Sequence, residues 1–520
     1  MQAVGGFDES FDVVVVGYGG AGAFAALAAA ETGARVLVLE KAPNPGGITL
    51  CSFGSVRSAS DADKAFAYLK ATNAGRTPDE ALRPLADGMA KVEQQIRDLA
   101  AKVGAKVDTR EARTCYLAFP GNDTFYDTLV TEVAGHADSS TAYPHLHISG
   151  SLKACGWRLF KVLEDNLALH RVEIRLSVAA ERFVLDDDGS IAGLVARHAD
   201  GRTMRIEARR GVVLACGGFE ASDEMKRQYW QMEPVLPVAS YSNTGDGIRM
   251  AQQVGADLWH MWHQHGVYGF RHPDPEVKLG IRAKGLPTWV PGKEEQASVG
   301  MSWIVLDQDG RRYMNEHHPY AQDTNARPME LFDPMRQRFP RIPSYMIVDE
   351  SSRKMYPVGV PTFNQVGVSY VWSEDNSREI ENGMLRRADT IEELASLLGA
   401  EVEVVRETLT RWNENCRAGS DRDFGRPDGT LVALDNPPYY VAELWPVVTN
   451  TQGGPRHDAR QRVIDVFGNP IPNLWTAGET GSVFGYLYLA GGNLAECAVG
   501  GTIAGHEAGR NVRAAKKSAA

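Results

Sequence analysis

The stretch NEHHPYAQ, residues 315–322, places a glutamate, two adjacent histidines and Tyr320 within a few positions in the middle of the chain. Carboxyl, imidazole and phenol groups can each give or take a proton in a reaction. Adjacent histidines on a loop are more often solvated or structural, so we assign no role to His317 and His318. Whether Tyr320 takes part in chemistry depends on what the rest of the chain can bind.

A second group of chemically active side chains is WHMWHQH, residues 259–265, which contains His260, His263 and His265. Closely spaced histidines can indicate a metal site. No further cluster of ligand residues stands near them, and the six cysteines of the chain form no CxxC pair. We therefore expect the histidines to line a pocket or to pack, the cysteines to be reduced, and no metal to be bound.

The N-terminal segment FDVVVVGYGGAGAFAALAAAETGARVLVLEK can position a nucleotide. A buried strand at 13–16, an alanine-rich helix and a second strand at 35–39 surround a GxGxxG sequence. Glycines at this spacing let the backbone turn tightly and approach a pyrophosphate at the helix N-terminus. Glu40, at the end of the second strand, can accept hydrogen bonds from both hydroxyls of an adenosine ribose. The segment therefore predicts a dinucleotide site.

Later segments indicate that the dinucleotide is FAD rather than NAD. A glycine pair in KAPNPGGITL follows Glu40 closely, a buried strand ends in LACGG, and AGE lies far downstream in NLWTAGETGS. A dinucleotide that is touched by segments hundreds of residues apart is typical of FAD. No second GxGxxG follows a strand, so we expect no separate NAD(P)H domain.

The length and net charge of the chain indicate its domain organisation and the kinds of partner it can bind. A chain of 520 residues predicts two domains. The net charge of −11 disfavours nucleic acid as a partner, because phosphate binding needs a basic face. No apolar run is long enough to span a membrane, and the N-terminus has no signal peptide, so we expect a cytoplasmic protein without a transmembrane segment.

Ordered blocks along nearly the whole chain resemble the fumarate reductase/succinate dehydrogenase flavoprotein superfamily, which includes the 3-ketosteroid dehydrogenases. The blocks include GYGGAGAFAALAAAETGARVLVLEK, LACGGFE, NTGDGIRMAQQVGADL, GRRYMNE, TQGGPRHDARQRVIDVFGNPIPNLWTAGETGS and LAGGNLAECAVGGTIAG. The resemblance implies an α/β fold. A two-part Rossmann-like FAD-binding domain, residues 1–270 and 440–520, would carry an inserted α+β catalytic (capping) domain, residues 271–439.

The glycine motifs and the resemblance together imply a set of FAD contacts. The region GGITLCSFGSVRS offers no histidine for the covalent attachment found in many members, so FAD should be non-covalent. The family places the GDG acid, the AGE acid and the GGN segment at the cofactor. The expected FAD-binding residues are Gly17, Gly19, Gly20, Ala21, Gly22, Glu40, Lys41, Gly46, Gly47, Thr49, Gly217, Asp246, Gly478, Glu479, Asn493 and Leu494.

Two positions that define the dicarboxylate-reducing members differ in this chain. Those members place a proton-donating arginine four residues after the NE glutamate, where this chain has Tyr320. They also keep a histidine three residues before a late GG, where this chain has Asn450. NExxPY instead resembles the 3-ketosteroid Δ1-dehydrogenases, whose tyrosine abstracts the substrate proton. A phenol with a pKa near 10 is a better base for a weakly acidic α-proton than a carboxylate near 4.

The resemblance also implies donors for the ketone oxygen, which becomes negative as the proton leaves. The steroid enzymes use a tyrosine hydroxyl and a glycine N–H from a YPGPG segment, and YLAGG here offers Tyr488 and Gly492. A one-residue gap leaves Tyr486 and Gly491 as the alternative pair. Tyr116, or else Tyr126, could assist Tyr320, as the steroid enzymes draw a tyrosine from the corresponding early region.

The leading hypothesis is FAD-dependent desaturation of a cyclic ketone to an enone. The expected substrate is a small apolar cyclic ketone, because aromatic residues gather around the proposed site. The electron acceptor would not be NAD, which leaves a quinone, a dye or oxygen. The alternative is reduction of an activated alkene by the fumarate reductase route. A third possibility is a flavoprotein subunit that serves electron transfer within a complex.

Overall fold

The valine run near the N-terminus forms strand β1 (Glu9–Val16), in which the side chains of Val13 to Val15 are fully buried. β-branched residues favour such a strand, because their side chains pack well on both faces of a covered sheet. Tyr116 and Tyr320 lie outside the described residues. The computed structural model describes residues 6–111, 119–146, 156–284, 299–317, 326–360, 364, 366–368 and 370–512.

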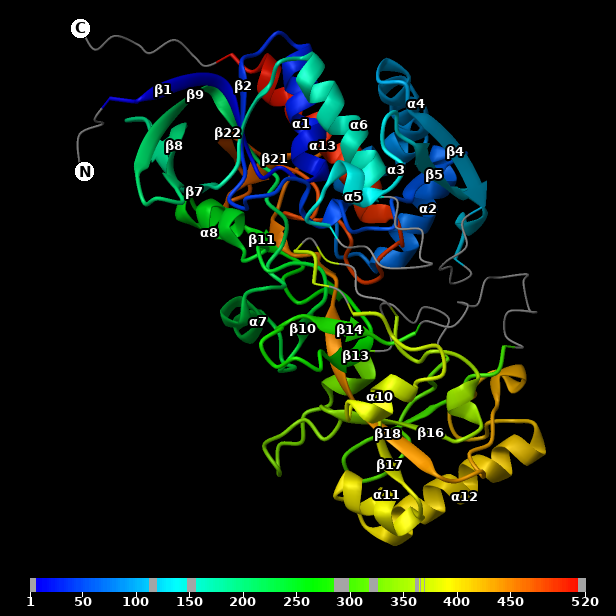
Figure 1. The fold of residues 1–520 in the computed structure, drawn as a ribbon. Coiled ribbons are helices and arrows are strands. Elements are labelled where there is room, and N and C mark those ends of the chain that lie inside the picture. The colour runs from blue at the N-terminus through cyan, green and yellow to red at the C-terminus, as the bar shows by residue number, and fades with distance from the viewer. Residues whose placement is uncertain are drawn as a thin grey trace, which may run out of the picture.

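β1 lies at the centre of an eight-stranded sheet in the upper lobe of Figure 1. It pairs in parallel with β2 and β9, and β22, from late in the chain, pairs in parallel with β9. β8 pairs antiparallel with both β7 and β9, so these strands form an antiparallel extension of the same sheet. The chain is thus an α/β protein, as predicted. The other strands of this sheet are β2 (Val36–Leu39), β6 (Glu173–Arg175), β7 (Val178–Leu185), β8 (Ile191–His198), β9 (Thr203–Leu214), β21 (Arg462–Ile464) and β22 (Pro470–Thr476).

Helices α1 (Gly20–Glu31) and α13 (Gly492–Arg510) lie side by side in this lobe (Figure 1). Their backbones approach closely because glycines stand at the contact. A Cβ at Gly505 would lie 2.1 Å from the carbonyl oxygen of Ala25. The first and last parts of the sequence therefore build one region together. The same lobe carries α6 (Gly156–Leu169), and α8 (Asp246–Gln253) lies at its lower edge.

A small antiparallel sheet, in the order β3-β5-β4, stands beside α13. Helices α2, α3 and α4 belong to this part of the lobe (Figure 1). Each of these three strands contributes one charged side chain to the lining of a cavity: Arg57 from β3, Arg110 from β4 and Asp127 from β5. The elements are β3 (Val56–Ala59), β4 (Lys106–Glu111), β5 (Phe125–Glu132), α2 (Ala62–Asn73), α3 (Asp79–Met89), α4 (Val92–Lys102) and α5 (Ser139–Ala142).

The second lobe contains a seven-stranded sheet built around β18 (Tyr439–Val448). β18 pairs with β10, β13, β16 and β17, so strands from before residue 270 belong to this sheet. The domain limits at 270 and 439 stay a prediction. The other elements are β10 (Leu236–Pro237), β13 (Tyr268–Arg271), β14 (Gly280–Arg282), β15 (Ile304–Leu306), β16 (Ser344–Asp349), β17 (Arg386–Ala388), α7 (Asp223–Tyr229), α10 (Ser377–Glu381), α11 (Ile391–Leu398) and α12 (Val402–Ala418).

Two short antiparallel pairings bring the histidine segment onto the C-terminal part of the chain. β11 (Leu258–Trp259) pairs with β20 (Gly454–Pro455), and β12 (Gln264–His265) pairs with β19 (Asn450–Thr451). His265 therefore lies opposite Asn450. Among the helices that the structure describes, none has the length and apolar character needed to cross a bilayer.

Candidate cofactor and active site

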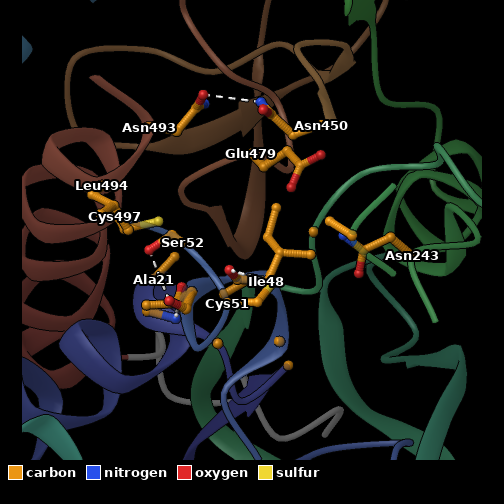
Figure 2. Close-up of a pocket in the computed structure, with 18 of the residues that line it drawn as sticks. Ala21, Ile48, Cys51, Ser52, Asn243, Asn450, Glu479, Asn493, Leu494 and Cys497 are labelled. Carbon is orange, nitrogen blue, oxygen red and sulfur yellow. Dashed lines mark hydrogen bonds between the residues drawn. The ribbon is translucent and has the colours of Figure 1, made fainter. Parts of the chain in front are cut away.

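A cavity of about 470 Å³ is lined by segments from both ends of the chain. Its lining includes the turn after β1, Glu40 and the loop with Tyr488. Figure 2 shows a close-up of the pocket, with Ala21 on α1, Leu494 on α13 and Glu479 drawn around it. The lining brings together groups that are far apart in the sequence.

The turn after β1 leaves room for a ligand at the N-terminus of α1. Gly17 has a φ of +102°, and a Cβ there would lie 2.4 Å from the carbonyl oxygen of Ala215. A Cβ at Gly22 would lie 1.9 Å from the carbonyl oxygen of Gly17. A Cβ at Gly19 would meet nothing closer than 3.7 Å. The packed glycines hold the turn, and Gly19 presents open backbone to the cavity, as a pyrophosphate requires.

Glu40 lines the cavity just beyond this turn. Its carboxylate accepts hydrogen bonds from the N–H groups of Tyr18, at 2.9 Å, and Ala42, at 2.8 Å. Burial raises the pKa of Glu40 above its ordinary value, and the two N–H groups oppose that rise. Beside it, Lys41 Nζ lies 2.6 Å from Asp246 Oδ2, and both residues line the cavity.

Two buried carboxyl groups, those of Glu479 in the cavity lining and of Glu220, lie near enough to influence each other. Glu479 Oε1 accepts from the N–H of Thr451 at 2.8 Å, and Glu220 Oε1 accepts from Asn243 Nδ2 at 2.7 Å. Burial raises the pKa of Glu220 to about 7, and burial together with the charge of Glu220 raises the pKa of Glu479 well above its usual range. Both pKa shifts favour the protonated form of these carboxyl groups, with burial as the main cause.

A chain of amide groups runs along the C-terminal wall. Asn450 Nδ2 donates to Asn493 Oδ1 at 2.9 Å, which is drawn as a dashed line in Figure 2. Asn493 Nδ2 lies 3.2 Å from Gln452 Oε1 and 3.2 Å from Glu496 Oε2. Glu496 also accepts from the N–H of Val483 at 2.7 Å. These bonds fix the orientation of Asn493, which lines the cavity at the start of α13.

Tyr488 lines the cavity and is only 8% exposed. Its hydroxyl accepts from the N–H of Gly491 at 3.2 Å, and a hydroxyl that accepts one hydrogen bond can still donate its proton. Its ring centroid lies 4.2 Å from that of His265. The N–H of Gly492 donates to the carbonyl oxygen of Leu489 at 2.6 Å, so it reaches a substrate only if that bond opens.

The other tyrosines considered from the sequence lie elsewhere or are not described. The Tyr486 hydroxyl accepts from Arg76 Nη2 at 3.1 Å, and Tyr486 lines a second cavity of about 230 Å³. The Tyr126 hydroxyl donates to Glu93 Oε2 at 2.7 Å, and burial raises the pKa of Tyr126 to about 12. Of the two loop tyrosines, Tyr488 therefore faces the cavity that holds the predicted cofactor residues.

The three histidines of WHMWHQH have separate positions. His260 and His263 hydrogen-bond through Nδ1 to the carbonyl oxygens of Ser482 and Phe484, each at 2.9 Å. His265 lines the cavity and its Nδ1 lies 3.0 Å from Asn450 Oδ1. Within the described ranges, no group of histidine, cysteine, aspartate and glutamate side chains could hold a metal ion.

Most of the predicted cofactor residues line this one cavity. Gly22, Gly46 and Gly478 are not part of its lining, and Gly46 and Gly478 instead have positive φ values of 95° and 69°. Gly492 is also outside the lining. The predicted residues that line the cavity are Gly17, Gly19, Gly20, Ala21, Glu40, Lys41, Gly47, Thr49, Gly217, Asp246, Glu479, Tyr488, Asn493 and Leu494.

Charged residues that the sequence analysis missed also line the cavity. Arg57 on β3, Arg110 on β4 and Asp127 on β5 stand near the Tyr488 loop, and Arg282 comes from β14. Nothing in the sequence connects Arg57 with Asp127, because they meet only through the pairing of β3 with β5. The one sequence signal that could have revealed these residues is a charged residue inside a short apolar strand.

The family described as FAD binding domain matches residues 12–494. The chain belongs to this family. The fumarate reductase (cytochrome) of Shewanella frigidimarina is 26% identical over 507 residues, which cover 96% of this chain and 77% of that protein. The 3-oxosteroid 1-dehydrogenase of Mycobacterium tuberculosis is 27% identical over 571 residues, with coverages of 92% and 94%.

A solved structure shares the fold. The crystal structure of 3-ketosteroid delta1-dehydrogenase from Sterolibacterium denitrificans in complex with 1,4-androstadiene-3,17-dione matches with a TM-score of 0.77 at 22% identity. The match covers 96% of this chain and 99% of that chain. The sequence-based assignment to this flavoprotein superfamily is thereby confirmed, and FAD is the cofactor of this FAD-dependent oxidoreductase. The open backbone at Gly19 and the carboxylate of Glu40 fit the pyrophosphate and ribose of such a group.

Replacing Glu40 with alanine is expected to weaken FAD binding by about 10²–10⁴-fold. The carboxylate would hold two ribose hydroxyls, and each hydrogen bond to a charged group contributes about 1.5–3 kcal/mol. FAD affinity is measured by titrating the FAD-free protein and following flavin fluorescence. Glu31→Ala, at the exposed end of α1, is the matched control and should bind FAD as the parent does. Equal affinity in the Glu40 and Glu31 variants would contradict the assigned ribose contact.

Replacing Glu496 with glutamine is expected to flatten the pH dependence of stability. Burial raises the pKa of Glu496 from its ordinary 4.5 to about 8, so the folded chain holds this proton more tightly than the unfolded chain. The resulting stabilisation is complete below pH 4.5 and is lost as the pH rises to about 8, by up to about 1.4 kcal/mol per pH unit. Denaturant unfolding of the FAD-loaded protein across this window measures the slope. Glu414→Gln, on the exposed face of α12, should leave the slope unchanged, and an unchanged slope for Glu496→Gln would refute the assignment.

Proposed function

We propose that this oxidoreductase desaturates a cyclic ketone next to its carbonyl, in the manner of a 3-ketosteroid dehydrogenase. The observation that carries the proposal is the position of Tyr488. Its hydroxyl is held by the Gly491 N–H in the cavity wall, beside the ring of His265 and in the same cavity as the cofactor residues. A donor fixed at this place can stabilise negative charge on a ketone oxygen.

The reaction divides between the two ends of the ketone. Tyr320, acting as its phenolate, takes the proton from the α-carbon and becomes the neutral phenol, and the Tyr488 hydroxyl donates to the carbonyl oxygen as the enolate forms. Bound FAD supplies the two-electron acceptor for the hydride that leaves the β-carbon. The products are the α,β-unsaturated ketone and a proton on Tyr320. A quinone, a dye or oxygen then removes the electrons from the enzyme.

The similar proteins support both desaturation of a ketone and the opposite kind of reaction, reduction of an alkene. They include 3-oxosteroid 1-dehydrogenases and fumarate reductases at about the same identity. Tyr320, in place of the arginine of the dicarboxylate-reducing members, favours desaturation. Tyr320 would come from the predicted inserted domain, residues 271–439, whereas Tyr488 and the FAD residues would come from the two parts of the chain on either side of it.

Reduction of an activated alkene is the second candidate, and two observations favour it. His265 lines the cavity and bonds to Asn450, so an imidazole stands beside the position where the dicarboxylate-reducing members carry a histidine. Arg57, Arg110 and Arg282 also line the cavity, as binding of an anionic alkene would require.

A dye-linked assay of a ketone panel tests the proposal. The panel contains androstenedione and 4-substituted cyclohexanones, with dichlorophenolindophenol as the electron acceptor. We expect at least one saturated cyclic ketone to bleach the dye and to yield its enone. If no ketone is oxidised, and reduced dye instead drives hydrogenation of an enoate, the reductase function replaces this one.

A further inference from the structure

We propose that Arg327 is a positioning residue, which holds the loop that carries Tyr488 from the second lobe. This segment, the Tyr488 loop, comprises residues 484–491 between β22 and α13. The effect of Arg327 on turnover rests on the proposed function, whereas its hold on the loop rests on contacts within the protein alone.

The backbone of Arg327 is anchored in the core of the second lobe. Arg327 begins the short 3₁₀ helix Arg327–Glu330. Met329 of this helix is fully buried and belongs to the same hydrophobic cluster as Met346 of β16, a strand that pairs with β18. The helix is therefore fixed relative to the large sheet of this lobe, and the side chain of Arg327 starts from a fixed position.

The guanidinium of Arg327 contacts Tyr486 in the Tyr488 loop. Its Nη2 donates to the carbonyl oxygen of Tyr486. Its Cζ lies 5.7 Å from the centroid of the Tyr486 ring, a distance at which a cation is attracted to an aromatic face. Both contacts use the backbone and the ring of Tyr486, and neither uses its hydroxyl. One guanidinium thus holds the loop two residues before Tyr488.

The first lobe holds the same part of the loop. The N–H of Leu487 donates to the carbonyl oxygen of Thr72 on α2 at 3.3 Å. Arg76, which follows α2, donates from Nη2 to the Tyr486 hydroxyl at 3.1 Å. The Tyr488 loop is therefore bound to both lobes, and Arg327 supplies a contact from the second one.

The position of the loop determines where the Tyr488 hydroxyl lies. That hydroxyl accepts from the N–H of Gly491, which belongs to the same loop, and the Tyr488 ring stands beside His265. A donor to a developing oxyanion must be held within about 0.5 Å of its productive position. Arg327 lines the second cavity and is outside the described lining of the first, so it acts through the loop rather than on the substrate.

Hydrogen exchange of the Tyr488 loop tests this hold directly. Arg327→Met keeps an unbranched side chain and removes the charge and the donors. In the FAD-loaded variant, we expect the N–H groups of a peptide that spans residues 484–492 to exchange about tenfold faster, as loss of a hydrogen bond from a charged group allows. Exchange at the parent rate in Arg327→Met would overturn the proposal.

Arg378→Met is the matched control for this exchange measurement. Arg378 also donates to a backbone carbonyl oxygen, that of Val371, and its Cζ lies 4.9 Å from the centroid of the Tyr370 ring. Tyr370 belongs to the hydrophobic core of the second lobe, so these contacts do not join the two lobes. Arg378→Met should leave exchange of the Tyr488 loop unchanged, and faster exchange in both variants would overturn the specific role of Arg327.

Turnover in the dye-linked assay tests whether the hold serves catalysis. Arg327→Met should lower kcat about tenfold to a hundredfold, the cost of a small misplacement of a catalytic group. KM should change less, because the carbonyl donor acts mainly in the transition state. Arg327→Lys keeps a cation that can donate to the Tyr486 carbonyl, and should restore kcat to within a few-fold of the parent. Parent kcat in Arg327→Met, loss of FAD from it, or no rescue by lysine would overturn the positioning role.

The two measurements separate this proposal from the proposed function. Faster exchange in Arg327→Met, together with no ketone oxidation by the parent, would support the hold on the loop and remove the desaturase function. Ketone oxidation by the parent, together with unchanged exchange in Arg327→Met, would keep the desaturase function and overturn the role of Arg327.

Discussion

Replacing Tyr320 with phenylalanine is expected to lower kcat for ketone oxidation by about 10²–10⁴-fold, the usual contribution of a positioned acid or base. Phenylalanine keeps the ring and removes the oxygen that takes the α-proton. FAD should remain bound, because the predicted cofactor residues belong to other segments. The measurement is the steady-state rate in the dye-linked assay, with the flavin absorbance as the check on cofactor content.

Tyr313→Phe is the control for this change. Tyr313 precedes Tyr320 by seven residues and its hydroxyl lies 2.7 Å from Ser344 Oγ inside the second lobe. Loss of that bond should cost about 1 kcal/mol of stability and leave kcat near the parent value. If Tyr320→Phe kept the parent rate at full FAD content, Tyr320 would have no part in proton transfer.

Replacing Tyr488 with phenylalanine is expected to lower kcat by about 10²–10³-fold, as removal of one donor to a developing oxyanion does. The hydroxyl stands in the cavity wall and is held by the Gly491 N–H. Because the ketone oxygen gains charge only as the α-proton leaves, KM should change less than kcat. Single-substrate kinetics at saturating dye separate the two parameters.

Tyr486→Phe decides between the two tyrosines of the loop. Tyr486 lines the second cavity and its hydroxyl accepts from Arg76, so its loss should leave kcat within a few-fold of the parent. A large loss in Tyr486→Phe together with a small loss in Tyr488→Phe would reverse the assignment of the carbonyl donor.

The nucleotide half of the site could be predicted from the sequence because its signals are local. The turn after β1 needs glycine at positions that a Cβ would block, and Glu40 follows directly after a buried strand. Contacts of this kind depend on residues close together in the chain. The predicted strand at 13–16 is the C-terminal half of β1, and the predicted strand at 35–39 corresponds to β2.

The arginine group could not be predicted, because its members meet only through tertiary pairing. Arg57, Arg110 and Asp127 come from three strands whose register places them on one wall. His265 reaches the cavity through the pairing of β12 with β19, far from it in sequence. From the sequence, all three histidines were expected to pack or to line a pocket. In the structure His265 lines the cavity, whereas His260 and His263 hydrogen-bond to backbone carbonyl oxygens.

Mixing the oxidised protein with saturated cyclic ketones in the absence of oxygen distinguishes ketone desaturation from alkene reduction. The yellow flavin absorbance should be lost, and one enone should form for each FAD. Deuterium at the β-carbon should slow that loss, and Tyr320→Phe should prevent it. If every ketone leaves the flavin oxidised, while the chemically reduced protein is reoxidised by an enoate, the chain reduces alkenes and the desaturase account is wrong.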